Sequence, residues 1–384
     1  MAWRTSKVQE QRMEFVIAAS RKEKSLSALC AEFQISRPTG YHWLKRYQEQ
    51  GLRGMEERSR RPRRSPRQTA AGVAERVVAL RQQRPDWGAR KLQHLLEREQ
   101  IRLPQSTIHR ILLRHDLVRA GDGRVQAEKR FERGRPNQLW QMDFKGPKGW
   151  DQAVGPLSIL DDHSRYAVAL QDTGSTQAEG VKAALEAVFR EHGVPDEMLM
   201  DHGTPWFNPQ ARQGWTQFTV WLMDQDVALL FSGYQHPQTQ GKVERFHRSL
   251  TAALLRRGAP AATQRQSWLD AFRQEYNCER PHEALQMRTP QQVWHKSSRP
   301  FRASPPRWDY PAGSERKEVD RTGQCRLEGR RYYLSKALAG REVGLIPLGP
   351  RIVVYYRRTL VGELNLLQGR LTPADLRPAC ADGV

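Results

Sequence analysis

The sequence predicts a multidomain protein with an α-helical N-terminal region, an α/β core and a small all-β C-terminal barrel. Its 384 residues exceed what one ordinary hydrophobic core holds, so we expect two to four domains. Apolar residues recur at helical spacing in the N-terminal third, whereas short apolar strands alternate with helices in the middle of the chain. After residue 300 the pattern changes to short strands separated by turns that carry Gly or Pro.

Basic charge is concentrated toward the N-terminus. Lys and Arg total 63, against 42 Asp and Glu. Residues 1–138 hold 31 basic and 15 acidic residues, a net of +16, whereas residues 139–384 hold 32 and 27, a net of +5. This asymmetry predicts an N-terminal region that binds a polyanion. Charge that only increases solubility gives the same composition, so composition alone leaves that alternative open.

Cysteine usage and hydropathy exclude several classes of protein. The four cysteines (Cys30, Cys278, Cys325 and Cys380) are scattered without paired spacing, which argues against a zinc knuckle or a disulfide framework and favours a reducing compartment. No apolar run approaches the length of a membrane span, and the N-terminus has no signal-peptide core. We therefore expect a soluble intracellular protein with no membrane partner.

A first helix-turn-helix DNA-binding domain is expected within residues 1–52. Helices are predicted over residues 7–20, 25–33 and 37–49. Ser25 is a plausible cap for the second helix, and Gly51 is expected to end the third. The residues expected to face DNA are Arg37, Thr39, Tyr41, His42 and Lys45. A small α-hairpin without a DNA partner gives the same pattern and remains an alternative.

The pattern recurs within residues 69–118, where we expect a second helix-turn-helix domain. A helix over 87–96 is followed by a turn at 101–103 and a helix over 104–115. Pro104 lies near the start of the last helix, where its missing N–H does no harm. The residues expected to face bases or phosphates are Ser106, Thr107, His109 and Arg110. Two such domains in series favour contact with DNA at two places.

Two linkers rich in Arg are predicted, over residues 53–68 and 119–137. The first holds an Arg/Pro/Ser run without an apolar face, so it cannot fold by itself. Extended arginine arms of this kind enter the minor groove or follow phosphates between two major-groove helices. The candidate contacts are Arg58, Arg60, Arg61, Arg63 and Arg64. A solvated linker that repels itself is the alternative.

Residues 138–300 are expected to form a mixed sheet covered by helices. Strands are predicted over residues 139–144, 155–161, 166–170, 197–205 with its closing turn, and 227–231. Helices are predicted over residues 176–192 and 215–224 and after the polar loop 236–241. In the last of these helices Val243, Phe246, Leu250 and Leu254 form one apolar stripe. Antiparallel strands followed by alternating helix and strand predict such a sheet.

A small all-β domain, interpreted as a barrel, is expected within residues 315–370. The predicted strands cover residues 325–327, 331–334, 342–346 and 351–356. Four arginines lie at its margins: Arg330, Arg331, Arg357 and Arg358. Contact with DNA and docking onto protein are both compatible with this composition.

Three acidic residues of the middle domain are candidates for metal binding. Asp143 lies within an apolar strand, Asp201 at the end of another, and Glu244 in the first turn of a helix beside its apolar stripe. An isolated carboxylate in such a place is unfavourable unless it is paired or holds a metal. Hard oxygen ligands suit Mg²⁺ or Mn²⁺. Two such ions about 3.5–4 Å apart can activate an attacking oxygen and stabilise a leaving one at phosphorus, which predicts a phosphodiester substrate.

Other polar residues compete with these assignments. Glu244 and Arg248 are four residues apart and are compatible with an ordinary exposed ion pair. Asp161 and Asp162 are rival acids, but they lie beside a predicted hairpin turn, so we expect them to be structural. Lys242 is a candidate DNA contact next to the acid-bearing helix, although ordinary surface charge is equally compatible with the sequence.

Several separate motifs stand in one order along the chain. They are Gln141-Met142-Asp143-Phe144, Leu160 to Tyr166, Asp201-His202-Gly203 and His236 to Phe246, followed by Tyr276-Asn277, Arg280-Pro281-His282 and Thr289-Pro290. Together they resemble the retroviral-integrase-like core of bacterial insertion-sequence DDE transposases. Residues 51–62 resemble the linker after the first helix-turn-helix in one branch of that family. The similarity covers roughly residues 10–300, and several motifs in order make a specific signal.

The resemblance implies a ribonuclease-H-like fold in which Asp143, Asp201 and Glu244 form a catalytic triad. It implies two bound Mg²⁺ ions, for which Mn²⁺ substitutes. It also implies a homo-oligomeric transposase, cytoplasmic and nucleoid-associated in a bacterium. Such an enzyme binds the terminal inverted repeats of its element, cleaves their 3′ ends and transfers the strands into target DNA.

One feature departs from the family pattern. Asp201 and Glu244 are separated by 42 residues, more than is commonest in these enzymes, and we interpret residues 207–214 as an inserted loop. A catalytically inert DNA-binding regulator and a nuclease that only hydrolyses remain as alternative functions.

Overall fold

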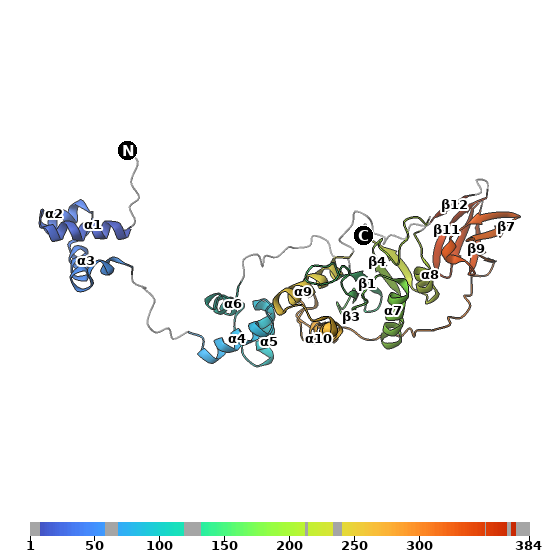
Figure 1. Cartoon of the computed structure of the whole chain (residues 1–384), viewed down its shortest axis with the longest axis horizontal. Helices are drawn as coiled ribbons and strands as arrows, with labels where there is room; N and C mark the ends of the chain where they lie inside the picture. The colour runs from blue at the N-terminus through green and yellow to red at the C-terminus, as the bar shows by residue number, and fades with distance from the viewer. Residues whose placement is uncertain are drawn as a thin grey trace. The chain divides into compact units, whose positions relative to one another are not determined.

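The computed structural model describes seven stretches of the chain, residues 8–57, 68–118, 132–211, 214–232, 240–349, 351–366 and 370–373. The chain divides into two compact units, Met1–Thr69 and Ala70–Val384, which are described separately (Figure 1). The predicted arginine arm (Arg58, Arg60, Arg61, Arg63 and Arg64) lies outside the described residues. Within the described stretches, no helix is both long and apolar enough to cross a membrane.

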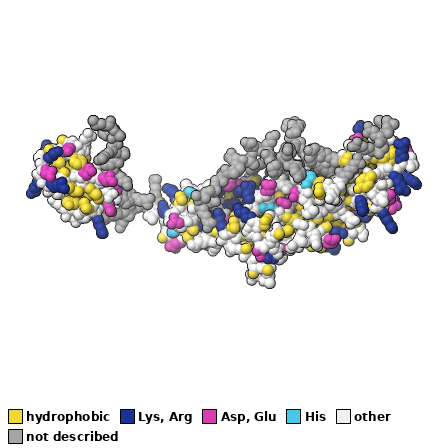
Figure 2. Space-filling view, turned by 45° about the horizontal axis from the view of Figure 1, so that its top comes forward, with side chains coloured by type: hydrophobic (Ala, Val, Ile, Leu, Met, Phe, Trp, Pro, Cys, Tyr) yellow, Lys and Arg dark blue, Asp and Glu magenta, His cyan; other side chains and the backbone are white. Residues whose placement is uncertain are grey.

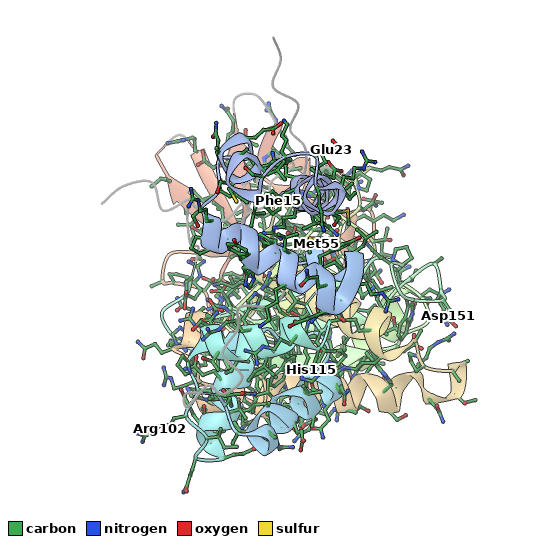
Figure 3. The ribbon with its side chains drawn as sticks, turned by 90° about the vertical axis from the view of Figure 1, so that its left-hand side faces the viewer. Phe15, Glu23, Met55, Arg102, His115 and Asp151 are labelled. Carbon is green, nitrogen blue, oxygen red and sulfur yellow. The ribbon has the colours of Figure 1, made fainter. Side chains whose placement is uncertain are left out.

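The first unit has the helix-turn-helix arrangement that the sequence predicts. Its helices are α1 (Val8–Arg21), α2 (Leu26–Glu32), α3 (Arg37–Gln50) and the 3₁₀ helix η1 (Gly51–Met55). Ser25 and Ser36 cap α2 and α3, because each side chain accepts a hydrogen bond from a backbone N–H in the first turn. Phe15 and Met55 lie between the helices and are 2% and 0% exposed (Figure 3). The folded unit therefore continues to Met55, past the boundary predicted at residue 52.

The second unit begins with three helices, α4 (Ala71–Gln83), α5 (Ala89–Arg98) and α6 (Gln105–Arg114). α5 and α6 are the predicted helix-turn-helix pair, and α4 is an additional helix that the sequence analysis does not anticipate. Trp87 is predicted to be helical but lies in the loop before α5, where it is fully buried. The three helices share one core, made of Val77, Leu80, Trp87, Leu92, Leu96, Ile108, Ile111 and Leu112.

A mixed five-stranded sheet follows in the order β3-β2-β1-β4-β5, as predicted. The strands are β1 (Leu139–Phe144), β2 (Leu157–Asp161), β3 (Ala167–Gln171), β4 (Glu197–Met200) and β5 (Ala228–Phe231). β1 pairs antiparallel with β2 and parallel with β4, so it lies at the centre of the sheet. Residues 132–137, predicted as linker, are bound to this sheet: the Asn137 N–H donates to Asp161 at 2.7 Å.

Helices cover both faces of this sheet. They are α7 (Ala178–His192), α8 (Gln217–Asp224), α9 (Gly241–Arg257) and α10 (Arg265–Cys278). α7 and α8 share a core with Trp140 and Met142 of β1, whereas α9 and α10 pack with Leu160 and Leu170 on the opposite face. Neighbouring residues of a strand point to opposite faces, so Gln141 and Asp143 project toward the face that α9 covers.

The C-terminal domain is an open sheet and not the closed barrel that the sequence predicts. Its strands are β6 (Glu315–Glu318), β9 (Glu342–Leu348), β10 (Arg351–Tyr356), β11 (Thr359–Asn365) and β12 (Arg370–Pro373), together with the separate hairpin of β7 (Gln324–Leu327) and β8 (Arg330–Tyr333). The sheet order is β12-β11-β10-β9-β6, and among the described strands β12 and β6 do not pair with each other. Closure depends on edge strands distant in sequence, which local patterns do not report.

Basic side chains gather on the C-terminal domain, at the right of Figure 2. Arg330 and Arg331 are exposed on β8. Arg357 instead donates to the backbone carbonyl of Pro306 at 3.0 Å, and Arg358 to that of Asp196 at 2.6 Å. Of the four predicted marginal arginines, two are therefore engaged in contacts that fasten the domain.

The α4–α6 helices are fastened to the core through Asp86. Its carboxylate is 1% exposed and lies 2.8 Å from Arg257 of α9 and 2.7 Å from Arg280. Burial alone raises the pKa of Asp86, but the two arginines outweigh it and hold the pKa below the ordinary value. The charged form is therefore the stable one at neutral pH. Arg256 also donates to the carbonyl of Pro85 at 2.7 Å.

Replacing Asp86 by Ala is expected to lower the free energy of unfolding by about 3 kcal/mol, because two poorly exposed guanidinium groups lose a shared carboxylate. Urea denaturation of the full chain at pH 7 measures this loss. Glu99→Ala is the control: Glu99 pairs with Arg76 at 2.6 Å, with side chains 35% and 39% exposed. Such a pair contributes less than about 1 kcal/mol, so equal losses in both variants would contradict the assignment.

Candidate active site

The three predicted acids come from neighbouring elements of the core. Asp143 lies on β1, Asp201 directly follows β4, and Glu244 lies in the first turn of α9. β1 and β4 are parallel neighbours whose register pairs Gln141 with Leu199. Asp143 lies two residues after Gln141, and Asp201 lies two residues after Leu199. The two acids therefore lie at the same edge of the sheet.

Burial and neighbouring negative charge perturb Asp143. Burial raises the pKa of this carboxyl to about 7, and the carboxylates of Asp201 and Glu244 add to the rise. The side chain remains 21% exposed. Asp143 therefore lies close enough to both other acids to interact with them electrostatically.

The acids do not form a closed metal cage. Within the described stretches, no group of three or more His, Cys, Asp or Glu side chains has an arrangement that could hold a metal ion. Asp201 is turned into its own loop, where it accepts hydrogen bonds from Gly203 N–H at 2.9 Å and Trp206 Nε1 at 2.6 Å. Trp206 in turn stacks on Phe144 of β1 with 5.5 Å between ring centroids, which anchors the loop to the central strand.

The donor set nevertheless fits a hard divalent cation in its chemistry. Asp143, Asp201 and Glu244 supply only carboxylate oxygens, the ligands that Mg²⁺ and Mn²⁺ prefer. Glu244 is exposed and has no polar partner among the described residues, and no ion pair joins it to Arg248 there. The raised pKa of Asp143 reflects burial first and then the charges of Asp201 and Glu244, and a bound cation would compensate that negative charge in place of a proton.

His247 lies beside Asp143 and is neutral. Its Nε2 is 2.9 Å from Ser158 Oγ, and its Nδ1 is 3.7 Å from Asp143. Burial, with the nearby Lys145 charge, lowers the pKa of His247 to about 3. Ser158 is the residue opposite Asp143 in the β1–β2 register, so His247 fastens α9 to the strands next to the acid.

Asp161 and Asp162 have the structural role expected for them. Both are fully buried. Asp161 accepts hydrogen bonds from Ser164 N–H at 2.7 Å and from Ser164 Oγ at 2.5 Å. Asp162 lies 2.6 Å from Lys242 Nζ, and the Lys242 side chain is 15% exposed. Lys242, a predicted DNA contact, is therefore engaged inside the domain, and burial lowers its pKa to about 8.

The other described DNA-contact candidates lie on α3 and α6. Arg37, Tyr41, His42 and Lys45 are exposed on α3, and Tyr41 is 64% exposed despite its large ring. Thr39 instead contacts the cap residue Ser36 at 2.8 Å. On α6, Ser106, His109 and Arg110 are exposed, whereas Ile108, Ile111 and Leu112 are buried. Thr107 is partly buried and accepts a hydrogen bond from Arg110 at 3.2 Å.

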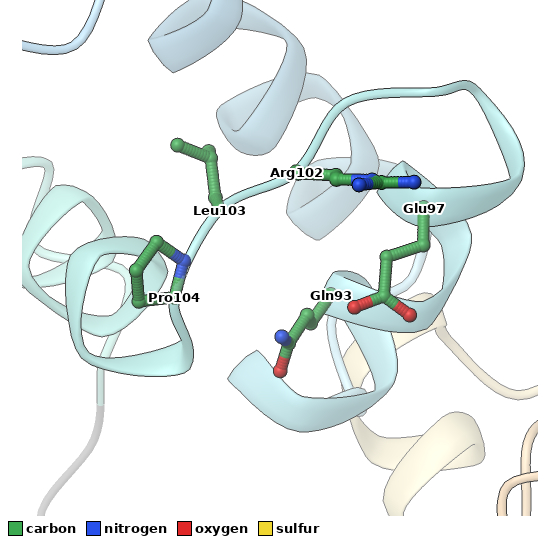
Figure 4. A pocket seen from close by; sticks show the side chains of 5 residues that line it. All are labelled: Gln93, Glu97, Arg102, Leu103 and Pro104. Carbon is green, nitrogen blue, oxygen red and sulfur yellow. The ribbon is translucent and has the colours of Figure 1, made fainter.

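A hollow in the second helix-turn-helix lies between α5 and the segment that leads into α6 (Figure 4). It is lined by Gln93, Glu97, Arg102, Leu103 and Pro104. None of the three acids lines it, so it is separate from the candidate active site.

Sequence reasoning missed two residues that shape the site. Gln141 is fully buried between Asp162 and α9, and Trp206 holds Asp201. Gln141 carried a signal, since a polar side chain in an apolar strand two residues before Asp143 shares its face of the sheet. The sequence held no such signal for Trp206, because the contacts of its side chain depend on how the loop after β4 folds.

Comparisons with known proteins agree with this domain order. Families described as Helix-turn-helix domain and Homeodomain-like domain match residues 11–63 and 39–112. Families described as Integrase core domain match residues 133–237 and 225–290. The chain is 27% identical over 225 residues to an uncharacterized 31.7 kDa protein of insertion element IS407 from Burkholderia multivorans, covering 57% of this chain and 79% of that protein.

Two further matches are a transposase and the catalytic core domain of a viral integrase. The transposase of transposon Tn552 from Staphylococcus aureus is 23% identical over 263 residues, covering 61% of this chain and 53% of the transposase, about half of its length. The catalytic core domain of HTLV-2 integrase, solved in complex with magnesium, shares 16% identity, with a TM-score of 0.33, over 42% of this chain and 99% of the viral domain.

The matched families cover both predicted helix-turn-helix regions and most of the mixed sheet with its helices. Two of the sequence relatives come from an insertion element and a transposon. The chain therefore joins helix-turn-helix domains to an integrase core and is similar to proteins of an insertion element and a transposon.

Proposed function

We propose that this protein cleaves DNA at the 3′ ends of its own insertion element and transfers the freed strands into target DNA, with Asp143, Asp201 and Glu244 as the catalytic triad. The observation that carries the proposal is electrostatic: Asp143 is partly buried next to the two other acids, and burial together with their charges raises its pKa. Perturbed carboxyls of this kind are typical of functional sites. Membership of an integrase-core family supports the same reaction class.

The three carboxyls are the residues that would hold two Mg²⁺ ions, with Mn²⁺ as a substitute. When bound, such ions supply the positive charge that activates an attacking oxygen and stabilises a leaving one at phosphorus. The chain's own residues do the rest. Trp206 orients Asp201 through its Nε1 hydrogen bond, and neutral His247, which is hydrogen-bonded to Ser158, lies 3.7 Å from Asp143 without adding charge.

The proposed substrate is duplex DNA. The exposed residues of α3 and α6 and the arginine arm would hold the terminal inverted repeats, and synapsis of two ends would require a homo-oligomer. DNA as substrate would place the reaction in the bacterial cytoplasm, at the nucleoid.

A nicking and joining assay tests this function. Purified protein is incubated with Mg²⁺ and duplexes taken from the DNA that flanks its gene, where matching inverted repeats are expected. We expect nicks at the 3′ ends of the repeats and joined products with a target duplex. Nicks without joined products would indicate a nuclease that only hydrolyses. Binding without nicks would indicate an inert DNA-binding regulator.

Replacing Arg60, Arg61, Arg63 and Arg64 together by Ala tests the arginine arm. If these residues neutralise phosphates, fewer counterions are released on binding, so the slope of log K against log salt should flatten by about one unit per lost contact. Filter binding across a salt series measures the slope. Arg76→Ala, in an exposed ion pair, is the control. An unchanged slope would assign these arginines to an ordinary linker.

A further inference from the structure

Among the described residues, the one that precedes α9 does not cap its first turn. α9 begins at Gly241, and the preceding Gln240 makes no side-chain cap hydrogen bond. An acceptor comes from the sheet instead, because the Val243 N–H donates to Gln141 Oε1 at 3.2 Å. Val243 is the third residue of α9, a position whose N–H a capping side chain ordinarily satisfies. A side chain of β1 therefore ties the start of α9 to the central strand.

The amide of Gln141 has one orientation. Its Nε2 donates to Asp162 Oδ1 at 2.9 Å, and both side chains are fully buried. An ionised carboxylate can only accept hydrogen bonds, so the amide nitrogen faces Asp162 and the oxygen faces Val243. Exchanging the two amide atoms would break both hydrogen bonds inside the domain.

Asp162 also holds α9 directly. Oδ1 lies 2.6 Å from Lys242 Nζ, and Oδ2 accepts a hydrogen bond from the Arg133 N–H at 2.7 Å. A buried carboxylate needs such partners, because removing one leaves charge uncompensated. Lys242 and Val243 are consecutive, so the first turn is fastened at two adjacent positions. We call Gln141, Asp162 and Lys242 the α9 clamp.

The α9 clamp lies next to the proposed catalytic acids. Gln141 is two residues before Asp143 on β1, so the two side chains share one face of the sheet. Glu244 follows Val243 directly and has no polar partner among the described residues. Its position relative to Asp143 is therefore set by where the helix begins. Small shifts of α9 are tolerated more readily by its apolar packing than by the buried hydrogen bonds, so the hydrogen bonds fix its position more narrowly.

We propose that Gln141 and Asp162 are positioning residues, which hold the first turn of α9 through Val243 and Lys242 and thereby set the distance between the Glu244 and Asp143 carboxylates. This inference rests on the proposed function for its consequence in catalysis. Misplacement of a reacting group by about 1 Å costs roughly 100-fold in rate, so such a clamp has a measurable effect.

Gln141→Met in the full-length protein is the central test, because Met keeps the length of the side chain and removes the hydrogen bonds to Asp162 and Val243. Gln225→Met is the matched control: Gln225 is 7% exposed, donates to Arg302 O at 3.0 Å and accepts from Arg302 N–H at 3.3 Å, away from the acids. Both variants lose the amide hydrogen bonds of a buried Gln, so we expect similar losses of thermal stability.

Two readouts separate positioning from stability. In Gln141→Met we expect the Mn²⁺ concentration for half-maximal nicking to rise about tenfold or more. The nicking rate should recover in part at high Mn²⁺, and the affinity for DNA should be unchanged. In metal-free protein we expect hydrogen exchange to become about fivefold faster or more in the first turn of α9 alone. Gln225→Met should change neither quantity. Asp162→Asn, which removes the charge but keeps an acceptor oxygen, should give a smaller change of the same kind.

The outcomes distinguish this inference from the proposed function. If the wild type nicks DNA and Gln141→Met shows the same Mn²⁺ dependence, the positioning role of the α9 clamp is refuted and the proposed function is retained. Absence of nicking by the wild type would refute the function, and hydrogen exchange in the first turn of α9 would then decide on the clamp alone. If Gln141→Met does not fold, Asp162→Asn supplies both readouts.

Discussion

Asp143→Asn is expected to reduce DNA nicking by about three orders of magnitude while leaving DNA binding nearly unchanged. The substitution keeps the shape of the side chain but removes the charge that would bind a divalent cation. Loss of one group that stabilises developing charge costs roughly 10²–10³ in rate, and a group shared by the whole triad belongs at the upper end. The predicted DNA contacts on α3 and α6 lie on other elements, so binding should persist.

The measurement is a single-turnover nicking assay beside a binding titration on the same duplex. Asp151→Asn is the control, because Asp151 lies in the same domain but is 54% exposed and pairs with Arg265. We expect wild-type nicking from this control. Retained nicking by Asp143→Asn would refute the assignment of Asp143 as a catalytic residue.

The same substitution is expected to stabilise the metal-free protein at alkaline pH. Burial raises the folded-state pKa of Asp143 from 3.8 to about 7. Between these values the unfolded chain releases a proton that the folded protein keeps, so stability falls as pH rises toward 7. Asn does not ionise, so the free energy of unfolding of Asp143→Asn does not fall in this way as the pH rises. The advantage should reach about 4 kcal/mol above pH 7, since one pKa unit corresponds to about 1.4 kcal/mol.

Urea denaturation in EDTA from pH 4 to pH 8 measures this difference. We expect nearly equal free energies of unfolding at pH 4 and a growing advantage for Asp143→Asn as the pH rises. Added Mg²⁺ should stabilise the wild type more than the variant, because ligand binding to the folded state alone raises stability. Parallel pH curves for the two proteins would show that Asp143 titrates normally and would remove the electrostatic support for the triad.

Local patterns were sufficient for most elements of the core. The apolar run of β1 and the apolar stripe of α9 are signals within one segment, and both elements lie where the sequence predicts them. α10 was missed although Leu269, Phe272 and Tyr276 recur at helical spacing and are buried. That signal was available in the sequence.

Other features had no local signal. Asp86 lies in a short loop before α5, and its buried role exists only because Arg257 and Arg280 come from elements more than 170 residues later. Lys242 was expected to be either a DNA contact or surface charge, but the fold places the buried Asp162 carboxylate 2.6 Å from it. Charge in a sequence does not reveal which partner the fold supplies.

The sequence by itself determined the order of domains and the central mixed sheet. It also placed Asp143 and Asp201 on neighbouring strands and Glu244 on a helix. These features depend on periodicity and on motif order. Only the tertiary structure decided that the C-terminal sheet is open, that Lys242 is engaged internally, and that Gln141 and Asp162 hold the helix bearing Glu244. The physical reason is that strand closure, burial of charge and hydrogen bonding across the sheet join residues distant in the chain, and their free energies depend on distances that no local pattern contains.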